Sequence, residues 1–295
     1  MPILRPVFRF APSPNGHLHL GHAFSALFSQ EMARRAGGRF LLRIEDTDPE
    51  RSRLEFETAI YEDLAWLGVQ WEAPVRRQSE HLDDYANALR TLQTLGVTYP
   101  CFASRKEIAA AIETGTGTAP RDPDGAYVYP GLCRGIAPDI AASRIRAGEP
   151  YALRLDMRAA VALAGRKLDE PLRFRSFDAD FHETEHEAVP QRWGDVVLGR
   201  KDSPAAYHVA VVIDDALQSV SHVTRGMDLL AATDIHRLLQ TLLDLPAPLY
   251  CHHRLILDVN GRKLSKSFKD TSLRSLRAEG ATPETIKEMV GFSCD

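Results

Sequence analysis

The chain has 295 residues, of which 44% are hydrophobic and 26% are charged, and its formal net charge is −4. This composition is ordinary for one or two folded globular domains, and it excludes a disordered or fibrous chain. No apolar run approaches the length of a membrane helix, and the charge balance gives no overall attraction to nucleic acid. We therefore expect no membrane association and at most a local polyanion site.

The N-terminal third of the chain alternates between strand and helix patterns. The residues from Met1 to Phe10 lack the apolar core of a secretory signal, and we expect none. Apolar runs predict strands over Val7–Phe10 and Phe40–Ile44, and helical spacing of apolar residues predicts helices over Leu20–Phe28, Phe56–Leu67 and Leu82–Leu95. Gly68 and Gly96 are placed to end the second and third helices.

The pattern changes after Cys101. The residues from Thr114 to Gly125 have no apolar period and are typical of a loop. From there to about Gln191 we expect irregular chain with short strands such as Tyr151–Leu155. This stretch therefore has the character of a separate module.

Strand–helix alternation returns near the C-terminus. The continuous apolar run Val209–Ile213 predicts a strand of a parallel sheet that is covered on both faces. A shorter strand is expected over Ser219–Val223 and a helix over Leu229–Leu243. Alternation at both ends predicts an α/β fold, a doubly wound parallel sheet of the Rossmann type interrupted by an inserted α+β module.

The segment between the first strand and the first helix carries a candidate phosphate site. Ala11–Gly16 is rich in Pro and Gly, and His19-Leu20-Gly21-His22 follows it. A helix N-terminus attracts phosphate through its dipole and unpaired N–H groups, and Gly21 allows a ligand to approach the backbone. His19 and His22 share one face of the first turn, where both can donate hydrogen bonds to phosphate oxygens. Histidines at this spacing also occur on surface helices without any function.

A second motif, Lys263-Leu264-Ser265-Lys266-Ser267, lies in the basic segment His252–Arg277. Lysines among small hydroxyl residues can neutralise a triphosphate, and the alternative is a solvated turn. In this order the two motifs resemble the His-Ile-Gly-His and Lys-Met-Ser-Lys-Ser signatures of class I aminoacyl-tRNA synthetases. The resemblance implies that ATP, with Mg²⁺, is bound by His19, Gly21, His22, Lys263 and Lys266, of which His19, His22 and Lys266 are catalytic.

Three further segments, Arg9–Gly16, Leu42–Asp48 and Val223–Asp228, resemble the glutamyl and glutaminyl branch of that family. The resemblance implies an L-glutamate pocket lined by Arg9, Ser13, Glu45, Tyr207 and Arg225. Arginines suit the two carboxylates of a dicarboxylic amino acid, because a guanidinium binds a carboxylate in a bidentate fork. Glu45 suits the ammonium group.

Two of these pocket residues have an alternative role. Glu45 could cap the helix after Pro49, a role that we assign instead to Asp48 or Thr47. Tyr207 could be a core residue just ahead of the buried strand.

After Ser267 the chain has room for two short helices but not for an anticodon-reading region. In this it resembles the glutamyl-Q tRNA(Asp) synthetase family, which are truncated paralogues of glutamyl-tRNA synthetase. The resemblance implies a ligase that forms glutamyl-adenylate without tRNA and transfers glutamate to queuosine at the wobble position of tRNA(Asp). The alternatives are a glutamyl-tRNA synthetase fragment that charges the tRNA 3′ end, and a non-catalytic paralogue that binds tRNA or nucleotide.

On this resemblance the chain divides into four segments. Residues 1–100 and 191–251 form the two halves of the catalytic domain, residues 101–190 an inserted module that binds the acceptor, and residues 252–295 the lysine loop with a helical tail. The family often carries zinc in the insertion, bound by Cys-x-Cys followed by Tyr-x-x-x-Cys.

Here Cys101, Tyr129 and Cys133 remain, while Ala103 replaces the second cysteine. Structural zinc takes four ligands, so the resemblance implies a Zn²⁺ site whose fourth ligand is water, Ser104 or a histidine. The alternative is a pair of buried, unreactive cysteines.

The two other cysteines, Cys251 and Cys294, match no motif. Four cysteines without a secretory signal point to a reducing compartment, and we expect a cytoplasmic monomer.

Overall fold

The computed structural model describes residues 5–115, 119–200, 206–257 and 271–292. Its helices are α1 (Leu20–Arg35), α2 (Leu54–Trp66), α3 (Leu82–Thr94), α4 (Arg105–Glu113), α5 (Pro138–Arg146), α6 (Met157–Leu168), α7 (Tyr207–Leu217), α8 (Thr233–Leu242), α9 (Leu273–Ala278) and α10 (Pro283–Met289). Its strands are β1 (Val7–Phe10), β2 (Arg39–Ile44), β3 (Glu72–Arg77), β4 (Thr98–Cys101), β5 (Ala152–Leu155), β6 (Arg173–Phe177), β7 (Glu183–Glu187), β8 (Val197–Arg200), β9 (His222–Gly226) and β10 (Leu249–His253).

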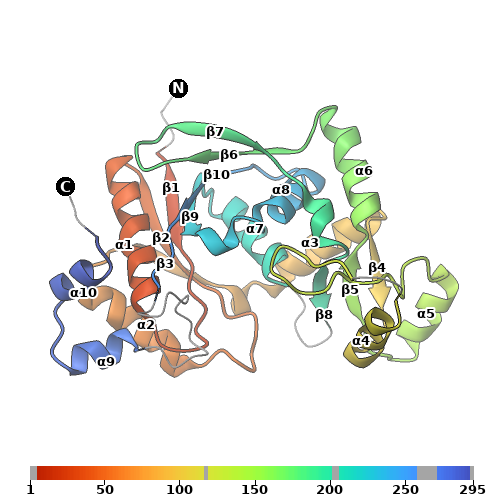
Figure 1. Cartoon of the computed structure of the whole chain (residues 1–295), viewed down its shortest axis with the longest axis horizontal. Helices are drawn as coiled ribbons and strands as arrows, with labels where there is room; N and C mark the ends of the chain where they lie inside the picture. Colours follow the sequence, from red (N-terminus) through yellow and green to blue (C-terminus); the bar gives the residue numbers. More distant parts are fainter. Residues whose placement is uncertain (1–4, 116–118, 201–205, 258–270, 293–295) are drawn as a thin grey trace.

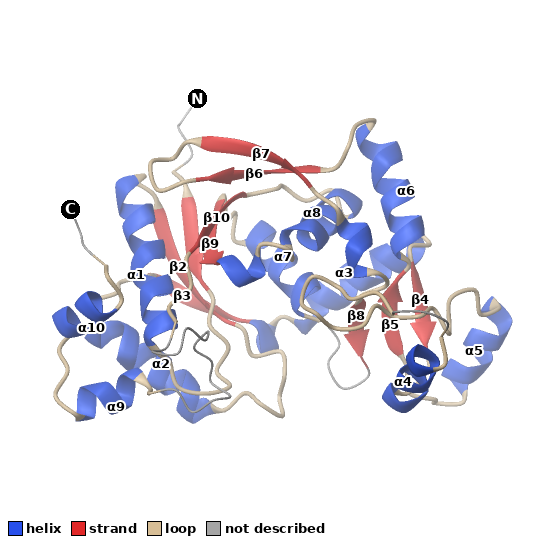
Figure 2. Ribbon diagram, viewed as in Figure 1, coloured by secondary structure: helices blue, strands red, loops and turns tan. Residues whose placement is uncertain are grey.

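The main sheet has seven strands in the order β3-β2-β1-β9-β10-β6-β7 (Figures 1 and 2). Its neighbouring strands are parallel, except that β7 runs antiparallel to β6. The chain passes from β1 to β2 on one side and reaches β9 on the other, so the strand order reverses at β1 and β9. Ligands of doubly wound sheets bind at such a switch point, beyond the carboxyl ends of the strands.

The two faces of this sheet have different chemistry, because successive side chains of a strand point to opposite faces. Phe8 and Phe10 of β1 pack with α1 and α2 in one apolar core. Arg9, between them in sequence, points to the opposite face, where its guanidinium reaches Asp215 of α7. Figure 1 shows α1 on one side of the central strands and α7 and α8 on the other.

A smaller antiparallel sheet, in the order β4-β5-β8, packs with α3, α6, α7 and α8 around a second apolar core. The hairpin of β6 and β7 comes between β5 and β8 in sequence but extends the edge of the main sheet. The inserted stretch therefore contributes to both sheets, and its boundaries at residues 101 and 190 stay a prediction.

Two predictions of secondary structure are wrong, and the strand predicted over Ser219–Val223 lies instead over His222–Gly226. Val209–Ile213 belongs to helix α7, not to a strand. A short apolar run fits a helix that is buried all round as well as a buried strand, and here α7 is enclosed by α3, α8 and β8. The stretch before Gln191 is not irregular, since it contains α5, α6 and the hairpin of β6 and β7. The strands and helices predicted in the N-terminal third are confirmed.

The C-terminal ends of α2 and α3 follow the sequence signals. Gly68 and Gly96 have φ values of +79° and +70° just after α2 and α3, as expected of glycines that end helices. Among the described residues, no helix combines the length and apolar character needed to cross a lipid bilayer.

Candidate functional site

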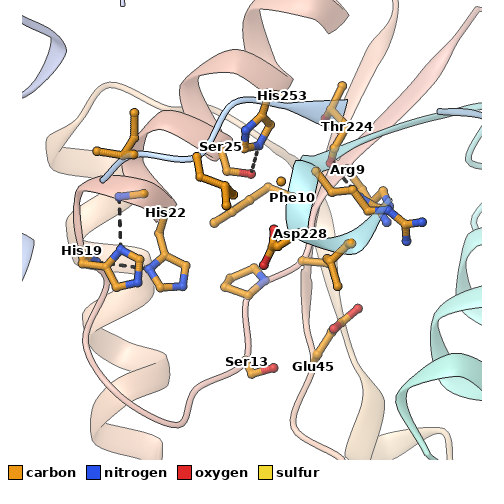
Figure 3. A pocket seen from close by; sticks show the side chains of 18 of the residues that line it. Arg9, Phe10, Ser13, His19, His22, Ser25, Glu45, Thr224, Asp228 and His253 are labelled. Atoms are coloured by element: carbon orange, nitrogen blue, oxygen red, sulfur yellow. Dashed lines mark hydrogen bonds between the residues drawn. The ribbon is translucent and has the colours of Figure 1, made fainter. Parts of the chain in front are cut away.

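The largest group of predicted site residues surrounds one cavity of about 400 Å³ at the switch point of the main sheet. The cavity lies where β1, β2, β9 and β10 end. Its lining includes Arg9, Ser13, His19, Gly21, His22, Glu45, Tyr207 and Arg225. In the view of Figure 3, His19 and His22 lie on one side of the cavity and Arg9 on the other. The structure thus brings together every predicted glutamate-binding residue and the first nucleotide motif.

Helix α1 begins at the cavity with two histidines that cap it. The His19 ring accepts a hydrogen bond from Gly21 N through Nδ1 (3.1 Å), and His22 Nδ1 accepts one from His19 N (3.2 Å). Because each Nδ1 is an acceptor, the hydrogen of each neutral ring is on Nε2, where it can be donated to an anionic oxygen. A Cβ atom at Gly21 would lie 3.0 Å from the His19 ring. Glycine at this position therefore allows the His19 ring to pack closely against the backbone of the first turn.

Arg9 is held by a buried ion-pair network on the α7 face of the sheet. Its Nε donates to Asp215 Oδ1 (3.1 Å), and Arg43 NH1 donates to the same oxygen (2.7 Å). Arg43 NH2 also donates to Glu45 Oε1 (3.2 Å). Burial opposes the ionised form of Asp215, but Arg9 and Arg43 outweigh it and lower the pKa. Asp215 therefore fixes Arg9 as a charged, oriented group beside the cavity.

Glu45 lies one residue beyond β2, and its side chain is 10% exposed. Burial raises the pKa of Glu45, and the positive charges of Arg43 and Arg9 offset part of this increase. Glu45 and Asp228 are the acidic residues among the described lining of the cavity. Carboxylate oxygens suit an ammonium group or Mg²⁺, so the lining can accommodate either cation.

Arg225, at the end of β9, is 4% exposed and has a different environment. Its N–H groups donate to His236 Nδ1 (3.0 Å), His252 Nε2 (3.2 Å) and Thr233 Oγ1 (2.7 Å). No acidic side chain of the described chain forms an ion pair with it. A buried guanidinium without a counter-ion favours an incoming carboxylate strongly.

A second cavity, of about 370 Å³, shares Ser13, Glu45 and Tyr207 with the first. Tyr207 is the first residue of α7 and is 37% exposed, so it is a wall between two cavities and not the core residue of the alternative reading. Arg51 and Arg200 line the second cavity and not the first. The two cavities are therefore neighbours with a shared wall.

Other predicted residues fall elsewhere. Lys263 and Lys266 lie outside the described residues. Asp48 and Thr47 do not cap α2, whose N-cap is Arg53; Asp48 Oδ1 instead accepts from the N–H groups of Glu50 and Arg51 in the preceding turn. The extra turn separates Asp48 from the start of the helix.

Several lining residues were not predicted from the sequence, namely Asn15, Ser25, Thr224, Asp228 and His253. His253 Nε2 and Ser25 Oγ lie 3.1 Å apart across the cavity wall (Figure 3). Asp228 and Thr224 belong to the quoted segment Val223–Asp228, so their proximity to Arg225 was a signal that could have identified them.

The predicted zinc ligands lie together but do not complete a site. The Cys101 thiol lies 3.2 Å from Tyr129 Oη, which accepts from Cys133 N (2.9 Å), and Arg154 stacks on the Tyr129 ring at 3.8 Å. Among the described residues, no further His, Cys, Asp or Glu joins the two thiols in a metal-binding group. These residues do not fit four-coordinate zinc, and Zn²⁺ stays an untested prediction. Cys251 is buried and free, and Cys294 lies outside the described residues.

A family model described as "tRNA synthetases class I (E and Q), catalytic domain" matches residues 7–292 of the chain. The chain is similar to a protein of Rhodobacter capsulatus named "Glutamyl-Q tRNA(Asp) synthetase", with 46% identity over 97% of this chain and 100% of that protein. It is also similar to "Glutamate--tRNA ligase" of Aquifex aeolicus, with 37% identity over 94% of this chain but 55% of that protein.

Among solved structures, the glutamate-tRNA synthetase of Elizabethkingia anophelis superimposes with a TM-score of 0.75 and 26% identity, over 97% of this chain and 61% of that one. The chain therefore spans a little more than half of the longer relatives, and all of the shorter one.

Proposed function

Because the chain belongs to the family of class I tRNA synthetase catalytic domains for glutamate and glutamine, which are ligases, we propose that it activates L-glutamate with ATP and transfers it to queuosine at the wobble position of tRNA(Asp). The observation that carries the first step is Arg225, a buried arginine that has no acidic partner among the described residues. The second step is supported by the R. capsulatus relative, which is named "Glutamyl-Q tRNA(Asp) synthetase" and aligns over its whole length.

Glutamate fits the charges of the main cavity. Arg225 and Arg9 each offer guanidinium N–H groups to one carboxylate, and Glu45 accepts a hydrogen bond from the ammonium group. Ser13 and Tyr207 complete the wall toward the second cavity. The three charges of the amino acid are therefore all met by charges of opposite sign.

The activation step needs no covalent bond to the protein. A carboxylate oxygen of glutamate attacks the α-phosphorus of ATP, the bond to the bridging oxygen of the β-phosphate breaks, and pyrophosphate leaves glutamyl-adenylate behind. Catalysis is then positioning and stabilisation of phosphate charge. His19 and His22 donate from the start of α1, with Gly21 allowing close approach, and Lys263 and Lys266 are proposed to add positive charge. Mg²⁺, which is general in this family, supplies further charge neutralisation when bound.

The acceptor is proposed to enter through the second cavity. A hydroxyl of the queuosine diol attacks the carbonyl carbon of the adenylate, the bond to the AMP oxygen breaks, and an ester of glutamate forms with loss of the hydroxyl proton. Arg51 and Arg200 line this route and suit the phosphates of a polynucleotide.

Glutamate-dependent ATP–pyrophosphate exchange, with and without tRNA, tests the first step. We expect exchange with glutamate alone, and its loss in Arg225→Ala, because one substrate carboxylate is then left without a cation. Arg39→Ala, which removes an exposed arginine paired with Glu72, is the matched control and should exchange normally. No exchange with any amino acid would contradict the proposal.

Transfer to the acceptor needs a separate assay. Labelled glutamate should appear on tRNA(Asp) that contains queuosine, even after removal of the 3′-terminal adenosine, and not on tRNA(Asp) without queuosine. Exchange that requires tRNA(Glu), together with labelling of its 3′ end, would instead support the activity named in the A. aeolicus relative.

A further inference from the structure

The two arginines of the main cavity differ in how their charge is balanced. Arg9 donates to Asp215, a buried carboxylate 3.1 Å away, so its charge is met within the protein. Arg225 has the same exposure, 4%, but its described hydrogen-bond partners are two imidazoles and a hydroxyl, which are neutral acceptors.

The geometry determines which ring nitrogens carry hydrogen. A guanidinium cannot accept a hydrogen bond, so His236 Nδ1 and His252 Nε2 must both be acceptors and both rings are neutral. The remaining hydrogen of His236 is then on Nε2, which lies 3.1 Å from His208 Nδ1 and donates to it. Arg225 is thus fixed by a chain of histidines that reaches back to α7.

The lowered pKa values of these rings agree with this assignment. Burial and the neighbouring Arg225 charge lower the pKa of His252 to about 3 and that of His208 to about 4, and they place the pKa of His236 well below its ordinary value. None of the three rings lines the main cavity itself, so at that cavity they act on a ligand through Arg225; His208 also lines the second cavity.

We infer that His236 and His252 are positioning residues that determine amino-acid specificity: they orient Arg225 by hydrogen bonds and leave its positive charge for the side-chain carboxylate of glutamate. The inference rests on the proposed function. Glutamine carries an amide in place of that carboxylate, so discrimination between glutamate and glutamine has to occur at the end of the side chain. An acidic residue at either histidine position would orient Arg225 equally well but would cancel the charge that makes the discrimination.

A pair of substitutions at one position separates charge from hydrogen bonding. His236→Asn places an amide oxygen near the position of Nδ1 and keeps a neutral acceptor for Arg225, whereas His236→Asp places a carboxylate there. In ATP–pyrophosphate exchange we expect His236→Asp to raise the KM for glutamate roughly 10- to 100-fold with a smaller change in kcat. It should also reduce the preference for glutamate over glutamine by a similar factor. His236→Asn should stay within about threefold of the parent protein on both measures.

The second position gives an independent pair. His252→Gln keeps an acceptor near Nε2 and should behave as the parent protein does, while His252→Glu should behave like His236→Asp. This pair decides the question if His236→Asp does not fold, which circular dichroism of each variant reports. Equal effects of the acidic and amide variants, or an unchanged glutamate preference in the acidic ones, would overturn the inference. If the parent protein activates no glutamate, it is the proposed function that fails.

Discussion

Asp214 is a buried carboxylate whose role is structural. Its side chain is 0% exposed and accepts from Arg76 Nε (2.7 Å), Gln78 Nε2 (2.8 Å) and Tyr85 Oη (2.9 Å), with Arg43 Nε at 3.6 Å. Asp214→Ala would leave the buried Arg43 and the partly buried Arg76 without this anion, and we expect it to lower the free energy of unfolding by about 3–5 kcal/mol. Urea denaturation followed by circular dichroism measures this loss.

The matched comparison for Asp214 is a surface ion pair. Arg39 and Glu72 are about half exposed, so Arg39→Ala should cost less than about 1 kcal/mol. Similar losses for the two variants would show that the buried network contributes no more than an exposed pair.

At the scale of residues, the motif residues could be predicted from the sequence, but the residues that hold them in place could not. Arg9, Glu45 and Arg225 stand in segments that resemble the glutamyl and glutaminyl branch, and that resemblance implies the pocket. Asp214 and Asp215 follow an apolar run that we interpreted as a strand, and nothing near them in sequence indicates that they meet arginines of three strands. The histidine chain around Arg225 could not be predicted either, because its members lie far apart in sequence, on α7, α8 and β10.

At the scale of elements, we expect opposite effects from replacing two glycines by alanine. Gly226 ends β9, and a Cβ atom there would lie 2.3 Å from Asp228 Oδ1 and 3.0 Å from Leu255. Gly226→Ala should therefore displace Asp228 and the cavity wall. We expect glutamate activation to fall roughly tenfold or more, with little change in stability. Pyrophosphate exchange and urea denaturation of the same preparation give both quantities.

Gly165, inside α6, is the control for Gly226. No atom lies within 4 Å of a Cβ at Gly165, so alanine there should raise the free energy of unfolding by about 0.5–1 kcal/mol and leave activity unchanged. An active Gly226→Ala protein would contradict the crowding that the structure shows at the end of β9.

Helices could be predicted from the sequence where their apolar periodicity extends over several turns. The amphipathic spacings of α1, α2 and α3 extend over several turns, and glycines mark two of the ends. The run Val209–Ile213 is too short to carry a period, and only its burial between α3, α8 and the small sheet decides for a helix.

At the scale of the whole molecule, the buried histidines make stability depend on pH. His208, with a pKa of about 4, and His252, with a pKa of about 3, are neutral in the folded protein but bind a proton below pH 6.5 when unfolded. His236 behaves likewise. Stability is therefore complete above pH 6.5 and falls as the pH decreases toward 4, by about 2 kcal/mol per histidine at pH 5. Asp63 works in the opposite direction, since burial raises its pKa to about 6.

Urea midpoints between pH 5 and pH 7.5 measure this dependence. In His252→Gln one titrating ring is gone, so the slope of stability against pH should be shallower than in the parent protein. A flat profile, or a profile that His252→Gln leaves unaltered, would show that these rings are accessible to protons in the folded state.

The face of the main sheet that meets α7 also sets an order of events during synthesis. Arg76, Arg43 and Arg9 precede their aspartates on α7 by 138, 172 and 206 residues. In a nascent chain that ends before α7, these three guanidinium groups lack their partners Asp214 and Asp215. We therefore expect this face of the first strands to stay hydrated until Asp214 and Asp215 have been synthesised. We expect the pocket to form late, because its lining comes from both ends of the chain.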